Sequence, residues 1–455
     1  MMGRLFVLAL ILALGLSRPV AAESVQLSPA SMRATGQAAL QAKRPEVALQ
    51  IADALLARDP NDWQALLIQS QAARDLGQLD LARAAAQRAW RLAETRPQRY
   101  AAALARAQAE ASDGRRTVSQ LWLRRAAQDA PDEHARALAL RDFRYVRARN
   151  PLRVNFGFGI VPSSNINGGS SSDTLWLTLF GQPIPFTLSP EAQALSGIET
   201  RLSLGVERRI STGPRHETRL GVNLSGRVYS LSSEARRKAP DADADDYAFA
   251  AAELYVGHEA QPSDWRAPWD MRATLGHNIY GGDALSNYAR LDLGKAIALP
   301  DRQRLRVGMG LERQWRQDRA DRSATIQSLE TRYARSVPGG ALSFGLRAAR
   351  VRSQASDVDH TAYGVDADYT LAKPLAGARI GLNLGLETRD YDRSAFDPAG
   401  REDLKLRLGV TAFLPDLDYM GFAPEVSLQA ARTNSNISLY DSRDIGVGFN
   451  LRSAF

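Results

Sequence analysis

Three aspartates at alternate positions form the segment of this sequence that comes nearest to a metal-binding motif. Asp241, Asp243 and Asp245 match the first three ligand positions of a calcium loop, in which carboxylate oxygens surround the ion. The sixth position, where the loop needs Gly, is Asp246, and the twelfth, where a bidentate Glu belongs, is Ala252. We therefore expect a solvated acidic loop with at most weak calcium binding, and we assign no metal site.

Residues that could perform catalysis are scattered along the chain. Neither a G-x-S-x-G nor an H-E-x-x-H motif occurs. The five histidines show no pair at helical metal-ligand spacing: His134, His216, His258, His277 and His360. The absence of Cys excludes disulfides, thiolate metal sites and Cys nucleophiles. We expect no catalytic residue, no cofactor and no enzymatic activity, so transport or display is the favoured class of function.

Residues 1–22 have the pattern of a secretory signal peptide. Arg4 precedes a 12-residue apolar stretch, and the small residues Val20, Ala21 and Ala22 stand before an expected cleavage site at Glu23. The apolar stretch is too short to span a bilayer. We expect export from a Gram-negative cytoplasm, which removes nucleic acid from the expected partners.

Residues 23–150 are expected to form a helical repeat domain. Residues 31–150 are rich in Ala, Leu, Arg and Gln, and small residues recur 34 positions apart, as in Ala48 and Ala82. This is the period of the tetratricopeptide repeat, a helix–turn–helix unit whose stack presents a groove for a polypeptide. The alternative is a helical spacer without a ligand. Seven helices are expected near 31–43, 45–58, 62–76, 78–95, 98–112, 115–129 and 132–148.

From Pro151 to Phe455 the sequence alternates between apolar and polar residues with a period of two. The strands are ten residues or longer, and their connections alternate between short and long, which favours a transmembrane barrel over a soluble sandwich. A final strand ending on aromatic Phe455 resembles the signal read by outer-membrane assembly machinery. Fourteen antiparallel strands are expected, starting near 152, 198, 217, 247, 269, 287, 303, 324, 341, 361, 378, 403, 421 and 443. The fold class is therefore a tetratricopeptide-like α-solenoid followed by a β-barrel.

An even number of strands places both ends of the barrel domain on one side of the membrane, so the helical domain is expected in the periplasm. Aromatic residues near strand ends are expected at the membrane interfaces. They are Tyr229, Tyr247, Tyr280, Tyr288, Trp315, Tyr333, Tyr391 and Tyr440.

The connection between the first two strands, residues 161–197, is longer than an ordinary loop. Its large apolar side chains, such as Trp176 and Phe186, need burial, so we expect the segment to fold into the lumen as a plug or lining. The alternative is a loop packed on itself at the surface. The candidate gating residues are Asn165, Asn167, Trp176, Phe180, Pro185, Phe186, Pro190 and Glu191.

Two short motifs carry a family resemblance. Residues 162–167 read Pro-Ser-Ser-Asn-Ile-Asn, and residues 185–192 read Pro-Phe-Thr-Leu-Ser-Pro-Glu-Ala. With the order of domains, they make the chain resemble the surface lipoprotein assembly modifier (Slam, type XI secretion) family. The resemblance implies translocation of lipoproteins or soluble proteins across the outer membrane. It brings no catalytic residue with it.

The leading hypothesis is an outer-membrane translocon that carries client proteins, lipoproteins or secreted soluble proteins, from the periplasm to the cell surface. Its expected partners are the client, outer-membrane lipid and the barrel-assembly machinery. The main alternative is an exopolysaccharide export porin, which also joins helical repeats to a barrel. A third possibility is a passive structural barrel or adhesin.

The net charge of +8 is distributed unevenly. Residues 1–30 contribute +1; residues 31–150 hold 20 Lys or Arg against 13 Asp or Glu, a net +7; and residues 151–455 hold 36 of each. We expect the excess to form a docking surface on the helical domain, for an acidic client segment or the anionic inner face of the outer membrane. Both attractions are screened beyond about 8 Å at physiological salt. The alternative is a general preference for Arg codons, since the chain has only five Lys.

Overall fold

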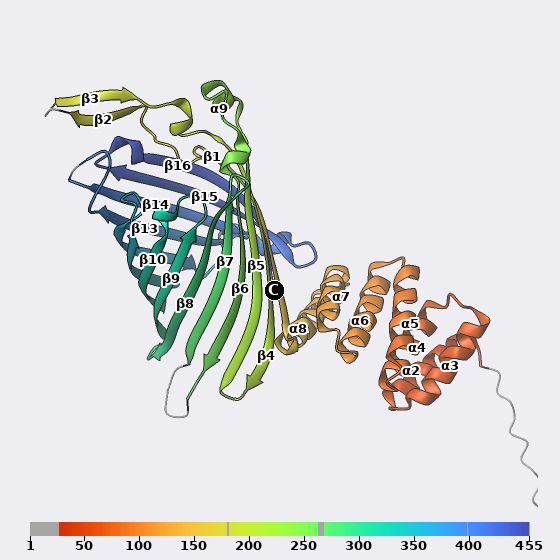
Figure 1. Ribbon diagram of the computed structural model, residues 1–455. Helices are drawn as coiled ribbons and strands as arrows, with labels where there is room; N and C mark the ends of the chain where they lie inside the picture. Colours follow the sequence, from red (N-terminus) through yellow and green to blue (C-terminus); the bar gives the residue numbers. More distant parts are fainter. Residues whose placement is uncertain (1–26, 180–181, 263–267, 398, 455) are drawn as a thin grey trace, which may run out of the picture. The chain divides into compact units, whose positions relative to one another are not determined.

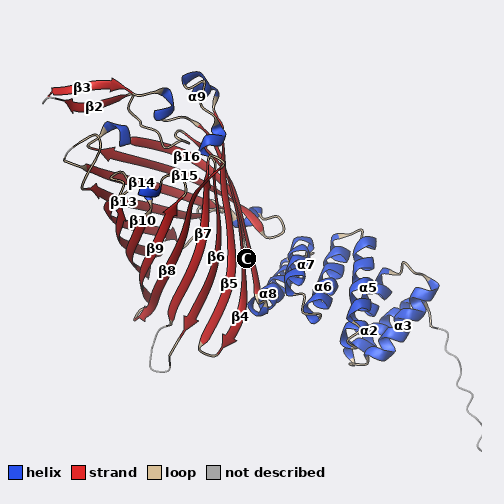
Figure 2. Cartoon of the chain, in the orientation of Figure 1, coloured by secondary structure: helices blue, strands red, loops and turns tan. Residues whose placement is uncertain are grey.

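The computed structural model describes residues 27–179, 182–262, 268–397 and 399–454 (Figures 1 and 2). The chain divides into two compact units, residues up to 133 and residues 134–455. The expected signal peptide, residues 1–22, and the terminal Phe455 lie outside the described residues.

The N-terminal unit is built of helices, drawn in orange in Figure 1. The helices of the described chain before the first strand are α2 (Pro29–Gln41), α3 (Pro45–Arg58), α4 (Trp63–Asp75), α5 (Leu79–Leu92), α6 (Arg96–Ser112), α7 (Arg116–Asp129) and α8 (Glu133–Arg149). None of the helices in the described part of the chain is both long and apolar enough to cross a membrane. All but the first residue of α8 belongs to the second unit, so the boundary between units lies 17 residues before the expected position at 150.

Small residues let these helices pack closely. Ala48 and Ala82, and likewise Ala52 and Ala86, are fully buried at equivalent places in α3 and α5. The helix ends repeat as well: α2 ends before Lys43 and α4 before Gly77, both at positive φ and 34 residues apart. The third helix pair is longer, and α7 begins 37 residues after α5. The expected helices are therefore confirmed, while their assignment as a tetratricopeptide solenoid stays a prediction.

Asp62 joins two of these helices. Its carboxylate caps α4 by accepting a hydrogen bond from the amide of Ala65 at 3.1 Å, and it forms an ion pair with Arg33 of α2 at 2.8 Å. Burial alone would raise the pKa of Asp62, but the hydrogen bonds and the positive charge of Arg33 outweigh it and hold the pKa below its ordinary value. The ionised carboxylate thus stabilises the folded helical unit.

The second unit is a closed antiparallel barrel, in which each strand pairs with its neighbours in chain order and β1 pairs with β16. Its strands are β1 (Leu152–Ser163), β4 (Gly197–Gly213), β5 (His216–Leu231), β6 (Phe249–Ala260), β7 (Trp269–Tyr280), β8 (Asp283–Leu299), β9 (Gln303–Arg316), β10 (Ala324–Val337), β11 (Gly340–Ser353), β12 (His360–Leu371), β13 (Arg379–Tyr391), β14 (Arg401–Phe413), β15 (Phe422–Ser435) and β16 (Ser442–Ser453). The expected fourteen strands are confirmed.

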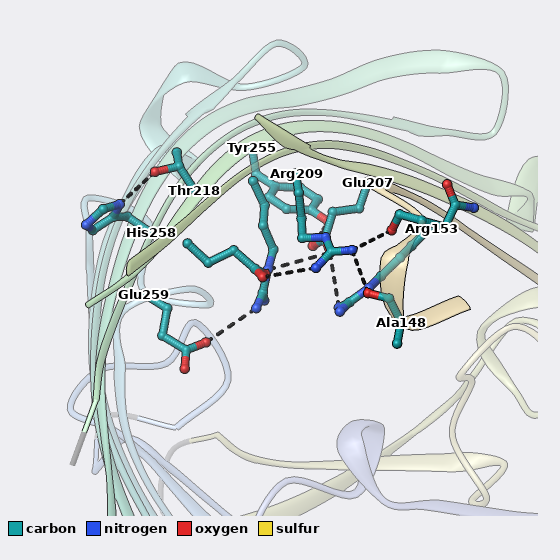
Figure 3. Close-up of polar contacts among 11 residues, drawn as sticks. Ala148, Arg153, Glu207, Arg209, Thr218, Tyr255, His258 and Glu259 are labelled. Atoms are coloured by element: carbon teal, nitrogen blue, oxygen red, sulfur yellow. Dashed lines mark hydrogen bonds and ion pairs between the residues drawn. The ribbon is translucent and has the colours of Figure 1, made fainter. Parts of the chain in front are cut away.

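Each barrel strand is 12 to 17 residues long and has two unlike faces. Large apolar side chains such as Leu204, Leu224 and Leu384 alternate with polar side chains and remain exposed, which places them on the outer surface. The polar side chains between them lie on the concave side of the wall, as Figure 3 shows for Glu207 and Arg209. The outer surface is therefore apolar and the lumen polar, as membrane barrels require.

The two ends of the barrel differ in their connections. We call the end where β1 begins the proximal end and the end where β1 finishes the distal end. At the proximal end, neighbouring strands are connected by short turns such as 214–215, 300–302 and 338–339. The distal end carries the long segment 164–196, with the hairpin of β2 (Thr174–Leu179) and β3 (Gln182–Thr187). It also carries the connection 232–248, with the short helix α9 (Ser233–Lys238).

We expect Asp62→Ala to lower the free energy of unfolding of the helical unit by about 2 kcal/mol at pH 7, because it removes a cap and a buried ion pair. Since folding lowers the pKa of Asp62, this contribution is complete above the unfolded-state value of about 3.9 and is lost as the pH falls through the folded-state pKa. Thermal unfolding of the full chain in detergent, followed by circular dichroism at 222 nm, measures the effect. The difference from wild type should shrink at pH 3. The exposed residue change Glu46→Ala is the control, and an unchanged midpoint for Asp62→Ala at pH 7 would contradict this reading.

Candidate functional site

Side chains on the lumen face reach across one strand to the next. The hydroxyl of Tyr255 on β6 donates to Glu207 on β4 at 3.0 Å, passing over Gly221 on β5. A Cβ at Gly221 would collide with the tyrosine ring, so this crossing requires glycine on the strand between. Each such contact ties three strands together.

Tyr288 on β8 repeats this arrangement. Its hydroxyl donates to Glu253 on β6 at 2.6 Å, and its ring lies where a side chain at Gly276 on β7 would be. The expectation that Tyr288 lies at a membrane interface is therefore wrong. Leu291, three residues further along β8, is 40% exposed on the outer face, so alternation places Tyr288 on the lumen face.

Ion pairs cross strands in the same way. Arg306 on β9 bonds Asp270 on β7 at 2.6 Å over Gly294 on β8. A second crossing is formed by Arg332, Asp366 and Gly345, with the two charged groups 2.8 Å apart. These charges border a recess of about 430 Å³ in the lumen wall. Fixed charges of both signs keep such a surface hydrated, so the lumen offers a path for polar groups.

At the proximal end, Arg209 of β4 holds the end of α8 (Figure 3). Its guanidinium donates to the carbonyl of Ala148 at 2.9 Å and of Asn150 at 2.7 Å, and lies 3.6 Å from Glu217. The last carbonyls of a helix have no partner within it and favour a nearby cation. Arg209 therefore fixes α8 to the barrel wall, and Arg153 on β1 lies beside the same cluster, 3.6 Å from Glu207.

Two of the candidate gating residues organise the base of the long distal segment. Asn165 bonds both the amide and the carbonyl of Gly169, at 3.0 and 2.9 Å. Asn167 donates to the carbonyl of Glu191 at 2.9 Å and accepts from the amide of Leu195 at 2.9 Å. The amide side chains thus bring the two ends of the segment together, and Pro190 and Glu191 begin the short turn Pro190–Ala192 on the returning side.

The other candidate gating residues lie on or near the β2–β3 hairpin. Trp176 is 56% exposed and Phe186 43% exposed, and Pro185 is exposed beside it. Trp176 and Phe186 are therefore not buried, and the role of the segment as a plug or lining stays a prediction. β2 lies instead against the turn between β15 and β16, where Ser438 donates to the carbonyl of Thr174 at 2.8 Å. Phe180 lies outside the described residues.

The acidic segment 241–245 adopts a local turn. Asp243 accepts a hydrogen bond from the amide of Asp245 at 3.0 Å and begins the turn Ala244–Tyr247. Among the residues that the structure describes, no three Asp, Glu or His side chains are grouped so as to hold a metal ion.

Sequence reasoning did not find Arg209 or the side chains that cross the lumen. Arg209 is one of many arginines, and its role depends on where α8 ends. The crossings do leave a signal, because Gly221, Gly276, Gly294 and Gly345 all take lumen-facing positions in strands.

The model of the surface lipoprotein assembly modifier family matches residues 153–455, which is about two thirds of the chain. This chain belongs to that family. The match spans both motifs, residues 162–167 and 185–192, and the whole barrel. No protein with a curated annotation matches the chain.

Several solved outer-membrane structures align with the barrel at low identity. A loop L8 deletion mutant of OmpT from Vibrio cholerae is 9% identical over 66% of this chain and 99% of its own, with a TM-score of 0.35. A BenF-like porin from Pseudomonas fluorescens Pf-5 is 7% identical over 66% and 98%, also with a TM-score of 0.35. OccK9 from Pseudomonas aeruginosa is 10% identical over 66% and 97%, with a TM-score of 0.34.

As a surface lipoprotein assembly modifier with a fourteen-stranded barrel, the protein lies in the outer membrane and has a role in secretion. The helical unit is periplasmic. Because β1 follows α8 directly, the proximal end of the barrel faces the periplasm and the distal end faces the cell exterior.

Arg209→Ala should free the end of α8, because it leaves two carbonyl groups and Glu217 without this partner. We expect trypsin to cut the purified protein after Arg147 or Arg149 at least tenfold faster than in wild type. The matched control is Arg208→Ala, which changes the outward-facing neighbour of Arg209. Trypsin should cut this variant at the wild-type rate. Equal cleavage of all three proteins would show that Arg209 does not hold α8.

Removing the β2–β3 hairpin, residues 174–187, tests the plug directly while leaving Asn165 and Asn167 in place. Since Trp176 and Phe186 are exposed rather than packed in the lumen, we expect single-channel conductance in planar bilayers to stay at the wild-type value. A clear rise in conductance would restore the plug hypothesis. A two-residue linker in place of the hairpin keeps the ends of the segment connected in the variant.

Proposed function

We propose that this protein moves lipoprotein clients from the periplasm to the cell surface through its barrel. The observation that supports this best is that α8 is fixed at the periplasmic end of a barrel whose lumen is lined with charged side chains. Arg209 holds α8 by the carbonyls of Ala148 and Asn150, so a client bound on α8 is delivered to the start of the lumen.

The charge on α8 suggests how a client binds there. The excess of +7 over residues 31–150 divides into two parts. Residues 31–133 have 15 basic and 12 acidic residues, a net charge of +3, and residues 134–150 have 5 basic residues and 1 acidic residue, a net charge of +4. More than half of the excess therefore belongs to residues 134–150 of the second unit rather than to the helical unit. Arg141, Arg144 and Arg147 are exposed, while Ala139, Phe143 and Val146 are buried. We propose that the exposed arginines attract an acidic segment of the client.

The proposed transport needs no chemical step in this chain. Many lumen charges are paired with one another, as in Arg306 with Asp270, and these pairs tie the wall together and keep its surface polar. Fixed and balanced charges let a polypeptide slide without binding tightly at one place.

A deletion strain tests the function. Cells are grown with an alkyne fatty acid, which labels all lipoproteins, and the labelled proteins that surface protease removes are identified. We expect one or a few lipoproteins to become protease-resistant in the deletion strain while their total amounts stay unchanged. An unchanged surface lipoproteome combined with loss of surface polysaccharide would instead identify an export porin.

The same assay tests the role of α8. We expect the charge-reversal variant Arg141→Glu, Arg144→Glu, Arg147→Glu to reduce surface delivery at least tenfold, because it repels an acidic client. The matched control is Arg44→Glu, Arg58→Glu, Arg91→Glu, which makes the same change in charge at exposed positions of the helical unit. Equal loss in both variants would argue against α8 as the capture surface.

A further inference from the structure

The barrel closes along one short ladder. Among the described residues, positions 158–160 of β1 pair with 449–451 of β16, and Ser163 pairs with Gly446. The other neighbouring strands of the barrel are paired over ten to sixteen positions. Pro162 lies in the gap between the two paired stretches and has no amide hydrogen to donate. We call the contact between β1 and β16 the seam.

Side chains fasten the distal end of the seam. The hydroxyl of Ser163 donates to Asp444 at 2.7 Å, and that of Ser164 lies 3.4 Å from the same carboxylate. The amide of Ile445 donates to the hydroxyl of Ser164 at 2.8 Å. Asn165 reaches the carbonyl of Arg443 at 3.4 Å. We call this group of side chains the clasp. Ser163, at the end of β1, and Ser164 and Asn165, which follow it, belong to the Pro-Ser-Ser-Asn-Ile-Asn motif.

The lumen face of the seam is rich in glycine. Gly157 and Gly159 on β1 and Gly446 and Gly448 on β16 stand where other strands carry charged or aromatic crossings. Across the seam, Asn450 lies over Gly159, and Val161 packs against Gly446 and Gly448. Opening this line therefore breaks few ladder bonds and, besides the clasp, mainly the contacts of Val161 and Asn450 on the lumen face.

The proposed client poses a physical problem that the seam solves. A lipoprotein carries acyl chains, whose transfer into a hydrated, charged lumen is strongly unfavourable for every methylene group. The polypeptide can move in the lumen only if the chains stay in lipid, and this requires a slit in the barrel wall along the direction of travel.

We propose that the seam between β1 and β16 is this slit: it parts to let the client's acyl chains pass from the bilayer side, and the clasp of Ser163, Ser164 and Asn165 on Asp444 and its neighbours closes it at the cell surface. The proposal rests on the function proposed above. It gives the motif at 162–167 the role of a latch rather than of a plug.

A disulfide across the seam tests the proposal, because the chain has no cysteine of its own. Gly159→Cys with Asn450→Cys joins an inward Gly and an inward Asn that face each other across the seam. Asn383→Cys with Gly409→Cys is the matched control, since it joins the same residue types face to face between β13 and β14. Both pairs are expressed in the deletion strain, and delivery of alkyne-labelled lipoproteins is measured with and without a reductant.

We expect the seam disulfide to reduce delivery at least tenfold, the reductant to restore it, and the control disulfide to leave it unchanged. Full delivery with the seam disulfide formed would overturn the proposal and leave the translocon function standing. Equal loss from both disulfides would also overturn it. If deletion of the gene itself changes no surface lipoprotein, the proposed function fails, and the seam proposal fails with it.

Hydrogen exchange of the purified protein gives a second test that does not depend on a client. Asp444→Ala removes the acceptor of the clasp. We expect amide exchange at residues 158–164 to rise at least tenfold in this variant, while residues 382–386 of β13 keep the wild-type rate. The exposed loop change Asp392→Ala is the control. Unchanged exchange at the seam in Asp444→Ala would show that the clasp does not hold it closed.

Discussion

The need to satisfy backbone hydrogen bonds within hydrocarbon is the constraint on which the rest of this structure depends. An open sheet edge in a bilayer leaves amide and carbonyl groups without partners, so strands can cross only as a closed barrel. Closure requires that the first and last strands meet, and here β1 and β16 meet over a short ladder finished by side chains. The barrel wall is continuous, but its strength is uneven around the circumference.

Away from the seam, the barrel wall is strengthened by side-chain contacts on its lumen face. A glycine on the strand between makes room for a tyrosine or arginine side chain that binds two strands away, so that each crossing ties three strands. These contacts replace the packed core that a soluble sheet would have on its inner face. They leave the centre of the barrel polar and hydrated, which suits the passage of a polypeptide and opposes the passage of lipid chains.

The regular parts of the molecule could be predicted from the sequence because each follows a simple period. Alternation over 14 segments predicts the starts of β1, β7, β9 and β10 at the residues where they occur, and the 34-residue spacing predicts the helices to within a few residues. Alternation also contains the information that Tyr288 faces the lumen, although its place near a strand end suggested an interface.

The site was harder to predict because its contacts join residues that no local period relates. Asn165 was assigned to gating from its place in a motif, but its partner Arg443 is 278 residues away, and only the closure of the barrel brings them together. The apolar residues of 174–187 suggested burial, but the segment pairs with itself as a hairpin and leaves Trp176 exposed. The charge of residues 134–150 was assigned from the sequence to the helical unit, because the sequence of a helix does not indicate which of two adjoining units the helix packs with.

The central claim is that a client polypeptide travels inside the barrel. Site-specific photocross-linking in living cells tests it most directly, with a photoreactive amino acid placed at Ser225, which faces the lumen, or at its neighbour Leu224, which is 46% exposed on the outer face. The account predicts adducts with alkyne-labelled lipoproteins from position 225 and none from position 224. Adducts from position 224 alone, or from neither position in cells that deliver their lipoproteins normally, would contradict it.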